Sequence, residues 1–328
     1  MTFSFSTDTQ VTLLLTAPLI TGAADENADT LKPTEYLKLT NALAKSSQTP
    51  GSLCDSKWED LPAEVRALID AERYRTLFAR GIQLSEAVER WESRAIWIAG
   101  QKDDGYPKRF TERLKDHSPS IVYGCGDPRI LETGGLAVVG SRDVDPILVE
   151  FTESIGRLAA RAGRTVISGA ARGIDQAAMR GALEAGGKVV GVMADSLERA
   201  AAQREHRELI SDGKLVLIST YDPSAGFNVG HAMQRNKLIY ALADAGLVVN
   251  SDYEKGGTWS GAVEQLDKYH FVPVYLRSTG EVSQAFDALQ RKGALPWPNP
   301  SGSEQFEQLL DQAAQVMQAS SSEQLSFL

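Results

Sequence analysis

The chain has 328 residues, of which 42% are hydrophobic, and a net charge of −9. This length suits one large domain with smaller additions, and the ordinary charged fraction excludes a disordered chain. No apolar run is long enough to span a bilayer, and two distant cysteines, Cys54 and Cys125, exclude a disulfide framework or a cysteine metal site. We therefore expect a cytoplasmic protein with no membrane association, metal or cofactor.

The acidic balance argues against binding to nucleic acid through bulk charge. Proteins that bind DNA without sequence preference usually carry a basic surplus. Residues 136–278 carry 16 basic and 17 acidic side chains, whereas residues 1–135 and 279–328 each have a net charge of −4. The centre of the chain is therefore the part that can present a local basic face.

The first third of the chain has helical patterns. Residues 1–10 are polar and are expected to be frayed, and Val11–Ile20 is interpreted as the start of the folded part rather than as a signal peptide. Residues 31–95 are expected to form short helices, with apolar residues at helical spacing over Asp60–Arg80. Residues 95–135 are irregular apart from a short strand at Ala95–Ala99.

From Leu136 onward, short apolar strands alternate with helical segments. The expected strands are Leu136–Val139, Thr165–Ile167, Lys188–Met193, Lys214–Ile218, Gly246–Val249 and Phe271–Leu276. The expected helices are Pro146–Ala162, Ile174–Ala185, Leu197–Ile210, His231–Ala245 and Ser260–Tyr269. This alternation predicts an α/β fold, extended and Rossmann-like, with a mainly parallel sheet and helices on both faces.

The pattern divides the chain into three parts. We expect a small, mostly helical domain over residues 1–94, the Rossmann-like domain over 95–278, and a short C-terminal helical extension over 279–328. In the extension, Gly293–Pro300 is a proline-rich linker or packed loop, Ser303–Met317 is a helix, and Ser320–Leu328 is a flexible tail.

Three turns between a strand and the following helix are suited to phosphate. Glycine lets the backbone approach a ligand, free N–H groups at a helix start attract anions, and arginine offers a forked donor. The turns are Val139-Gly140-Ser141-Arg142, Ser168-Gly169-Ala170-Ala171-Arg172-Gly173 and Lys255-Gly256-Gly257-Thr258. None is a Walker A loop or a complete G-x-G-x-x-G fingerprint. The evidence for phosphate binding is therefore the number of these turns and their order along the chain.

Two further features bear on these turns. Asp175, at a predicted helix start, is interpreted as a carboxylate that braces its loop rather than as a catalytic group. Arg235 and Lys237 lie within a predicted helix, and the apolar Leu238 and Ile239 that follow predict partial burial. Arg235 is therefore expected to point toward the ends of the strands.

Taken together, these motifs resemble the DprA (Smf) family. The resemblance covers about residues 95–277, beginning with Tyr106-Pro107 and Ser118–Tyr123. The matching motifs are Val139-Gly140-Ser141-Arg142, then Ser168 to Asp175 with the following Gln176–Leu183, then Arg235-Asn236-Lys237-Leu238-Ile239.

The resemblance implies a function as well as a fold. Members of this family bind single-stranded DNA, dimerise through this domain and help to load RecA. The candidates for phosphate contact that it implies are Gly140, Ser141, Arg142, Ser168, Gly169, Arg172 and Gly173, with Arg204 and Arg207 as weaker candidates. Bases are expected to stack on an aromatic ring, for which Tyr221 and Phe227 are near the right loop.

The chain also departs from the family pattern. The family's Ala-His is Ala178-Met179 here, and its Phe-Pro before the arginine-asparagine pair is replaced by Ala232-Met233-Gln234. These departures favour a divergent branch, such as the DprA-like proteins that act as antitoxins beside phosphoribosyltransferase-like toxins in phage-defence pairs.

The C-terminal residues resemble a peptide that binds the bacterial sliding clamp. Its usual form is QL(S/D)LF, and the chain ends in Gln324-Leu325-Ser326-Phe327-Leu328. The alternative interpretation is a tail that packs on its own domain.

Three functions therefore compete. The first is a single-stranded DNA-binding protein, the second a regulatory partner of a toxin, and the third a nucleotide-binding or nucleotide-hydrolysing enzyme. Gly256-Gly257-Thr258 followed by Glu264 resembles nucleotide phosphoribohydrolases of related fold, but their second glycine-rich motif is not matched and no nucleophile with its base is evident. We expect a binding protein rather than an enzyme, with either DNA or a free nucleotide as ligand.

Overall fold

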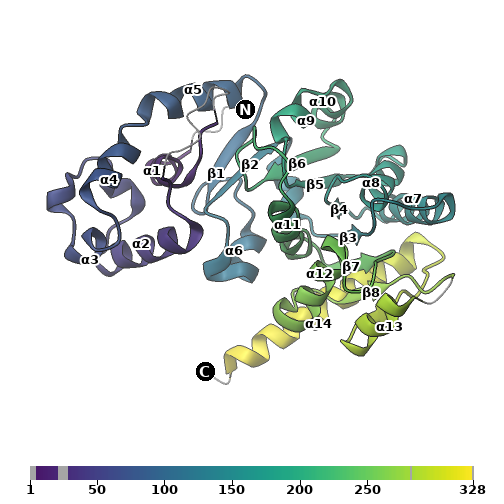
Figure 1. Ribbon diagram of the computed structural model, residues 1–328. Coiled ribbons are helices and arrows are strands. Elements are labelled where there is room, and N and C mark those ends of the chain that lie inside the picture. The colour runs from purple at the N-terminus through teal and green to yellow at the C-terminus, as the bar shows by residue number, and fades with distance from the viewer. Residues whose placement is uncertain (1–4, 21–28, 281–282, 327–328) are drawn as a thin grey trace.

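A mainly parallel sheet forms the centre of the protein in the computed structural model, which describes residues 5–20, 29–280 and 283–326, with side chains of the last helix described to residue 315 (Figure 1). Within these residues the sheet has nine strands in the order β1-β2-β6-β5-β4-β3-β7-β8-β9. They are β1 (Trp97–Gly100), β2 (Ile121–Cys125), β3 (Leu136–Val139), β4 (Val166–Ser168), β5 (Val189–Met193), β6 (Leu215–Ser219), β7 (Ala245–Val248), β8 (Val274–Leu276) and β9 (Leu295–Pro296). Strand β2 pairs in antiparallel fashion with β1 and with β6, and the other neighbouring strands are parallel.

Helices cover both faces of this sheet. Successive side chains of a strand point to opposite faces, so Leu136 and Val138 of β3 join one core cluster while Ala137 and Val139 join another. The first face packs against α1 (Thr7–Thr16), α5 (Gly81–Glu92), α7 (Pro146–Arg161), α8 (Ile174–Glu184), α9 (Leu197–Ala202) and α14 (Ser303–Ser326). The second packs against α6 (Lys108–Leu114), α11 (Val229–Leu242), α12 (Gly256–Glu264) and α13 (Gln284–Arg291). The expected Rossmann-like architecture is confirmed.

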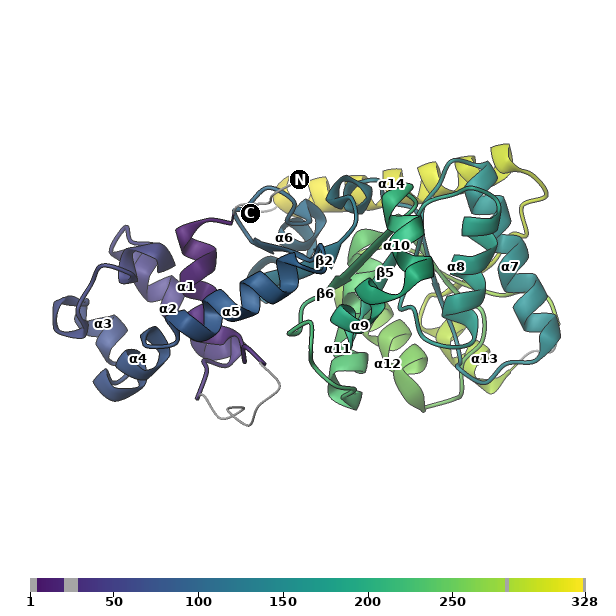
Figure 2. The same cartoon turned by 90° about the horizontal axis from the view of Figure 1, so that it is seen from above.

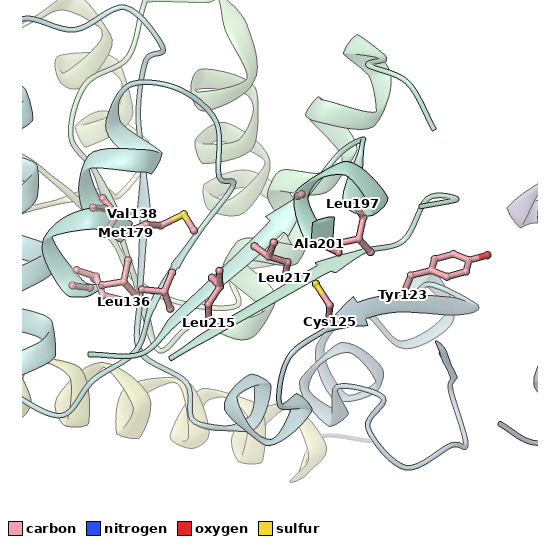
Figure 3. Packing of buried hydrophobic residues seen from close by; sticks show 14 of the residues in the cluster. Tyr123, Cys125, Leu136, Val138, Met179, Leu197, Ala201, Leu215 and Leu217 are labelled. Atoms are coloured by element: carbon pink, nitrogen blue, oxygen red, sulfur yellow. The ribbon is translucent and has the colours of Figure 1, made fainter. Parts of the chain in front are cut away.

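Figure 3 shows how the first core is filled. Leu136 and Val138 project from β3, and Leu215 and Leu217 project from β6 on the same face of the sheet, where Met179 of α8 joins the same cluster. These side chains are almost fully excluded from water, and burial of each contributes roughly 1.5–3 kcal/mol to folding. The short, continuous apolar runs that predicted these strands are typical of a sheet that helices cover on both faces.

The N-terminal helices have a core of their own. It is formed by α1 together with α2 (Pro33–Lys45), α3 (Ala63–Arg66) and α4 (Ala71–Phe78). Helices α2, α3 and α4 lie beside the sheet rather than over it (Figure 2). Helix α1 belongs to both parts, because Leu13 and Leu14 face the sheet while Val11 and Leu15 face the N-terminal core. The remaining helical segments are α10 (Arg204–Ser211), single turns at Pro50–Leu53, Trp58–Asp60, Lys115–His117 and Pro128–Glu132, and a π-helical turn at Gln265–Tyr269.

A buried arginine fastens the end of α1. The guanidinium of Arg80 donates hydrogen bonds to the carbonyl oxygens of Leu14 at 2.9 Å, Ala17 at 2.6 Å and Pro18 at 3.0 Å. The last carbonyls of a helix have no partner within the helix, so a cation placed there satisfies them and interacts favourably with the helix dipole. This interaction holds α1, and with it the N-terminal core, against the start of α5.

Two predictions for the N-terminal region are wrong in detail. Residues 7–10 are helical rather than frayed, because the hydroxyl of Ser6 caps α1 by accepting from the backbone N–H of Thr9 at 3.3 Å. The helical pattern over Asp60–Arg80 is broken before α4, where the carboxylate of Asp70 accepts from two backbone N–H groups and starts a new helix.

Further differences lie in the second half of the fold. The predicted helix Leu197–Ile210 is two helices, α9 and α10, because Gln203 between them has an extended backbone. The proline-rich stretch contributes the edge strand β9, where a proline is tolerated, and α14 continues to Ser326. Strand β2 was not expected. The proposed domain boundaries remain a prediction.

The close packing of α7 against α8 yields a prediction about stability. A Cβ atom at Gly181 of α8 would lie 2.2 Å from the carbonyl oxygen of Glu153 in α7, so the helices would have to separate. We expect Gly181→Ala to lower the free energy of unfolding by about 1–3 kcal/mol, measured by urea denaturation. A Cβ at Gly81, the first residue of α5, meets nothing within 4 Å, so Gly81→Ala should leave stability unchanged or slightly raised. Equal effects of the two substitutions would contradict this account.

Candidate functional site

The turns that follow β3, β4 and β7 lie together at the carboxyl edge of the sheet. The carbonyl oxygen of Ser141, after β3, accepts from the N–H of Ile174 at 3.2 Å, which joins the first turn to the second. The N–H of Ser141 donates to Asn250 Oδ1 at 2.8 Å, and Thr258 Oγ1 donates to the carbonyl of Gly140 at 2.9 Å, which joins the first turn to the third. The expected gathering of these corners is thus present in the fold.

One glycine explains how closely the first two turns approach. Gly173, just before α8, has φ of +84°, and a Cβ there would lie 2.3 Å from the carbonyl oxygen of Ser141. A side chain at this position would meet both backbone strain and a backbone atom that cannot move aside. Gly173 therefore shapes the site through packing, and the same turn leaves Arg172 on the surface.

Beside these turns is a hollow of about 220 Å³. It lies at the ends of β3, β4 and β5, and Phe227 of the loop that leads into α11 also lines it. Its lining residues are Arg142, Gly169, Ala170, Ala171, Arg172, Met193, Ala194, Asp195, Phe227 and Arg235. Of the predicted phosphate-contact residues, Arg142, Gly169, Arg172 and Arg235 therefore face one cavity.

Arg235 is the buried cation of this hollow. It is only 5% exposed, as its position in the predicted helix suggested, and its Nη1 lies 3.8 Å from Asp175 Oδ2. Within the part of the chain that the structure describes, its Nε and Nη1 atoms have no hydrogen-bond partner. A buried N–H without an acceptor is unfavourable, so Arg235 keeps donors that are open to an acceptor.

Gly169 makes room for the guanidinium of Arg235. A Cβ at Gly169 would lie 1.2 Å from Nη1 of Arg235, so any side chain there would displace the arginine. The N–H of Gly169 donates to Asp175 Oδ2 at 3.1 Å, which supports the interpretation of Asp175 as a loop brace. Burial raises the pKa of Asp175, and the charge of Arg235 opposes that rise. Burial likewise lowers the pKa of Arg235, and Asp175 opposes that shift.

Arg142 and Arg172 stand at the mouth of the hollow. Both are exposed, and neither forms an ion pair within the described part of the chain. The guanidinium of Arg142 lies 5.3 Å from the ring centre of Phe227, which is 57% exposed. An exposed phenylalanine beside two unpaired arginines combines a flat apolar surface with anion donors.

Asp195 and Met193 complete the lining and were missed in the sequence. Both lie at or just after the end of β5, at the same sheet edge as the glycine turns. The strand Lys188–Met193 was predicted, and ligands bind at the carboxyl ends of parallel strands, so the residues that follow it could have been predicted to lie at the site. No glycine or arginine marks that turn as an anion site.

Several predicted residues lie outside the hollow. Ser168 is fully buried and its hydroxyl donates to the carbonyl of Val138 at 2.6 Å, so its burial is incompatible with direct phosphate contact. Gly256, Gly257 and Thr258 start α12 beside the first turn, where Thr258 ties the turns together, and they do not line the cavity.

The remaining basic candidates also face elsewhere. Lys237 is half-buried, with its Nζ donating to Gln234 Oε1 at 3.2 Å and Glu264 and Lys268 nearby. Arg204 and Arg207 are exposed on α10, and the Nε of Arg204 lies 2.8 Å from Glu208 Oε1. A direct role at the hollow is not supported for these three.

The C-terminal peptide is only partly described. The backbone of Gln324 and Leu325 belongs to α14, while Phe327 and Leu328 lie outside the described residues. Clamp binding remains a prediction.

Two classes of feature are absent from the described residues. No group of three or more His, Cys, Asp or Glu side chains is arranged there to hold a metal ion. No helix in that part of the chain is long and apolar enough to cross a membrane.

The fold and this site define a Rossmann-type protein with an anion-binding sheet edge, and comparison with known proteins gives the family. The family model for DNA recombination-mediator protein A matches residues 97–300. The chain belongs to this family, as the sequence motifs indicated.

Curated relatives agree with this assignment. The chain is 26% identical over 153 residues to DNA processing protein DprA of Bacillus subtilis, covering 46% of this chain and 51% of that protein. It is 30% identical over 156 residues to DprA of Streptococcus pneumoniae, covering 47% and 54%. The chain thus spans about half the length of the curated relatives that it matches.

Solved structures show the same fold. The X-ray structure of DprA from Streptococcus pneumoniae superposes with a TM-score of 0.67 at 18% identity, covering 92% of this chain and 97% of that one. A structure of DprA from Helicobacter pylori, described as revealing a single-stranded DNA binding mode, gives a TM-score of 0.52 at 23% identity, covering 67% and 96%.

The buried pair of Arg235 and Asp175 yields a prediction about pH. Arg235→Met leaves the Asp175 carboxylate buried without its cation, so we expect the free energy of unfolding at neutral pH to fall by about 3–5 kcal/mol. In the variant the pKa of Asp175 rises further above its unfolded value, so the folded chain binds a proton that the unfolded chain does not. The lost stability should therefore be partly regained as the pH falls to about 5.

Urea unfolding at the two pH values measures this effect. The control is Arg172→Met, which removes an exposed arginine without an ion pair in the described residues and should change stability by less than about 0.5 kcal/mol. If Arg235→Met lowers the free energy of unfolding by the same amount at both pH values, the charge that the substitution leaves without a partner is not that of Asp175.

Proposed function

We propose that the chain binds single-stranded DNA and holds a phosphate of the strand in the hollow at the carboxyl edge of the sheet. The observation that carries the proposal is the buried Arg235, which lines the hollow and whose Nε and Nη1 have no hydrogen-bond partner among the described residues. A phosphate oxygen would satisfy these donors, and a charge-assisted hydrogen bond is stronger than a neutral one.

Three arginines reach this position from different elements. Arg235 comes from α11, Arg142 from the turn after β3 and Arg172 from the turn after β4. Their convergence gives a local cationic site on a chain whose net charge is −9. The strand would therefore be attracted by contacts at short range rather than by the overall field.

Family membership supports DNA as the ligand, and so does the single-stranded DNA binding mode described for the Helicobacter pylori protein. The phosphate could also belong to a free nucleotide, which offers the same oxygen atoms. We favour a strand because Phe227 lies at the mouth of the hollow, where a base of a bound strand can stack on it.

The exposed arginines allow a direct test by salt dependence. We expect wild-type affinity for a thymidine oligonucleotide to fall with salt, and Arg142→Ala and Arg172→Ala each to weaken binding and to reduce the slope of log K against log salt by about 0.7. Fluorescence anisotropy over a salt series measures both quantities. The control is Arg129→Ala, an exposed arginine before β3 that pairs with Asp127 and does not line the hollow. Binding that does not depend on salt, or an unchanged slope of log K against log salt in both variants, would contradict the proposal.

The proposed stacking surface is tested separately. Phe227→Ala should weaken binding of the oligonucleotide by about 1–3 kcal/mol, because base stacking on an aromatic ring contributes that amount. Phe227→Trp should preserve affinity. Val229→Ala is the matched control, since Val229 is another exposed apolar side chain near the start of α11 and does not line the hollow. Equal losses for Phe227→Ala and Val229→Ala would show that the ring has no specific role.

The other expectations stay predictions. They include a homodimer, RecA, the sliding clamp, a toxin partner in phage defence, and a cytoplasmic location. The enzyme alternative gains no support from Glu264, which lies outside the hollow with its Oε1 3.8 Å from Lys268 Nζ. The absence of catalysis likewise remains a prediction.

A further inference from the structure

An acidic side chain faces the proposed phosphate site and is not explained by phosphate binding. Asp195 lines the hollow together with the three arginines, and it forms no hydrogen bond or ion pair within the described residues. A carboxylate repels a phosphate, so its presence lowers affinity for the group that the arginines attract. Its place in the hollow therefore needs a ligand group that donates hydrogen bonds.

The surroundings of Asp195 limit what that group can be. The charged and titratable neighbours that act on the site are Arg235 and, through Asp195, His231. Arg235 already has Asp175 as its counter-ion at 3.8 Å, so neutralising Arg235 does not require Asp195. The ring face of His231 stacks on Tyr221, with ring centres 3.7 Å apart, and among the described residues His231 forms no hydrogen bond or ion pair with Asp195.

Asp195 and the exposed ring of Phe227 line the same hollow. The N–H of Ser196 donates to the carbonyl of Ala225 at 2.9 Å, which joins the turn after β5 to the loop before α11. Asp195 is the residue before Ser196, and Phe227 lies two residues after Ala225. An aromatic face and a carboxylate therefore lie on joined loops at one cavity, the combination that recognises a nucleobase by stacking and by its hydrogen-bonding edge.

We propose that Asp195 is a specificity-determining residue that reads the base stacked on Phe227 and selects guanine. The inference rests on the proposed function. Guanine presents two neighbouring donors, N1–H and the N2 amino group, which match the two oxygens of a carboxylate. Adenine and cytosine present one amino group beside an acceptor nitrogen, and thymine presents one N–H between two carbonyl oxygens that a carboxylate repels.

The test compares short oligonucleotides that differ in the central base. We expect the wild-type chain to bind dTTGTT about tenfold more tightly than dTTTTT, the discrimination of one good bidentate contact. An oligonucleotide with hypoxanthine at the centre keeps N1–H but lacks the amino group, so it should bind with intermediate affinity. Anisotropy titrations at one salt concentration measure all three.

Asp195→Asn separates recognition from a structural role. Because the substitution removes a negative charge from the hollow, affinity for dTTTTT should rise, while the preference for guanine should disappear. A merely structural aspartate would give the opposite result, with affinity for both oligonucleotides falling together and the preference retained. The control is Asp252→Asn, an exposed carboxylate at the same sheet edge that does not line the hollow and should leave the preference intact.

The outcomes distinguish this inference from the function beneath it. Equal affinity of the wild-type chain for dTTGTT and dTTTTT overturns base selection and leaves strand binding in place. A preference for guanine that survives Asp195→Asn overturns the role of this residue. Failure to bind any oligonucleotide refutes the proposed function, and the inference falls with it.

Discussion

The candidate site depends on one buried guanidinium. Arg235 is packed beneath the turn at Gly169, where only a glycine leaves room for it, and opposite Asp175, which supplies its counter-charge. A cation removed from water is unfavourable unless it is paired and hydrogen-bonded, and here pairing is present while hydrogen bonding is incomplete. The fold thus holds an arginine whose remaining donors can be satisfied by a ligand in the hollow.

In the proposed function, this arrangement explains how an acidic chain could bind a polyanion. The net charge of −9 is spread over the chain, with most of the excess in the flanks, whereas Arg142, Arg172 and Arg235 converge on one cavity. Charges separated by more than a Debye length are screened at physiological salt, so the flanking carboxylates have little effect on a phosphate in contact with the arginines. Asp195 lowers the positive charge of the hollow, which in the proposed function suits a whole nucleotide rather than phosphate alone.

One departure from the family motifs lies in α11, the helix that carries Arg235. The sequence lacks the family's aromatic residue before the arginine-asparagine pair and has Ala232 and Met233 there, and the ring that faces the hollow comes from Phe227, earlier in the chain. The supporting helix α11 is retained, with Asn236 donating to the carbonyl of Gly257 at 2.6 Å. In the proposed function, therefore, the arginine is held by the family's framework while the stacking surface belongs to this chain.

Local physical chemistry made much of the fold predictable. The strands from Leu136 to Leu276 are short apolar runs between turn residues, and Asp145 and Pro146 mark the start of α7 as capping rules require. The breaks at Asp70 and Gln203 were not predicted, because helical spacing continues across them and the interruption depends on local capping or an extended residue. Strand β9 was missed because a two-residue strand containing proline is stable only when β8 is beside it.

The sequence by itself determined the class of fold, the family and the arginines of the site, since each is recorded in local residue patterns. Only the tertiary structure decided which of these residues share a cavity: it brought Arg235 under Gly169 from a helix distant in sequence, placed Asp195 and Phe227 beside it, and buried Ser168 in the core. The physical reason is that burial and the pairing of charges arise from contacts between elements far apart in the chain, which no local pattern of residues encodes.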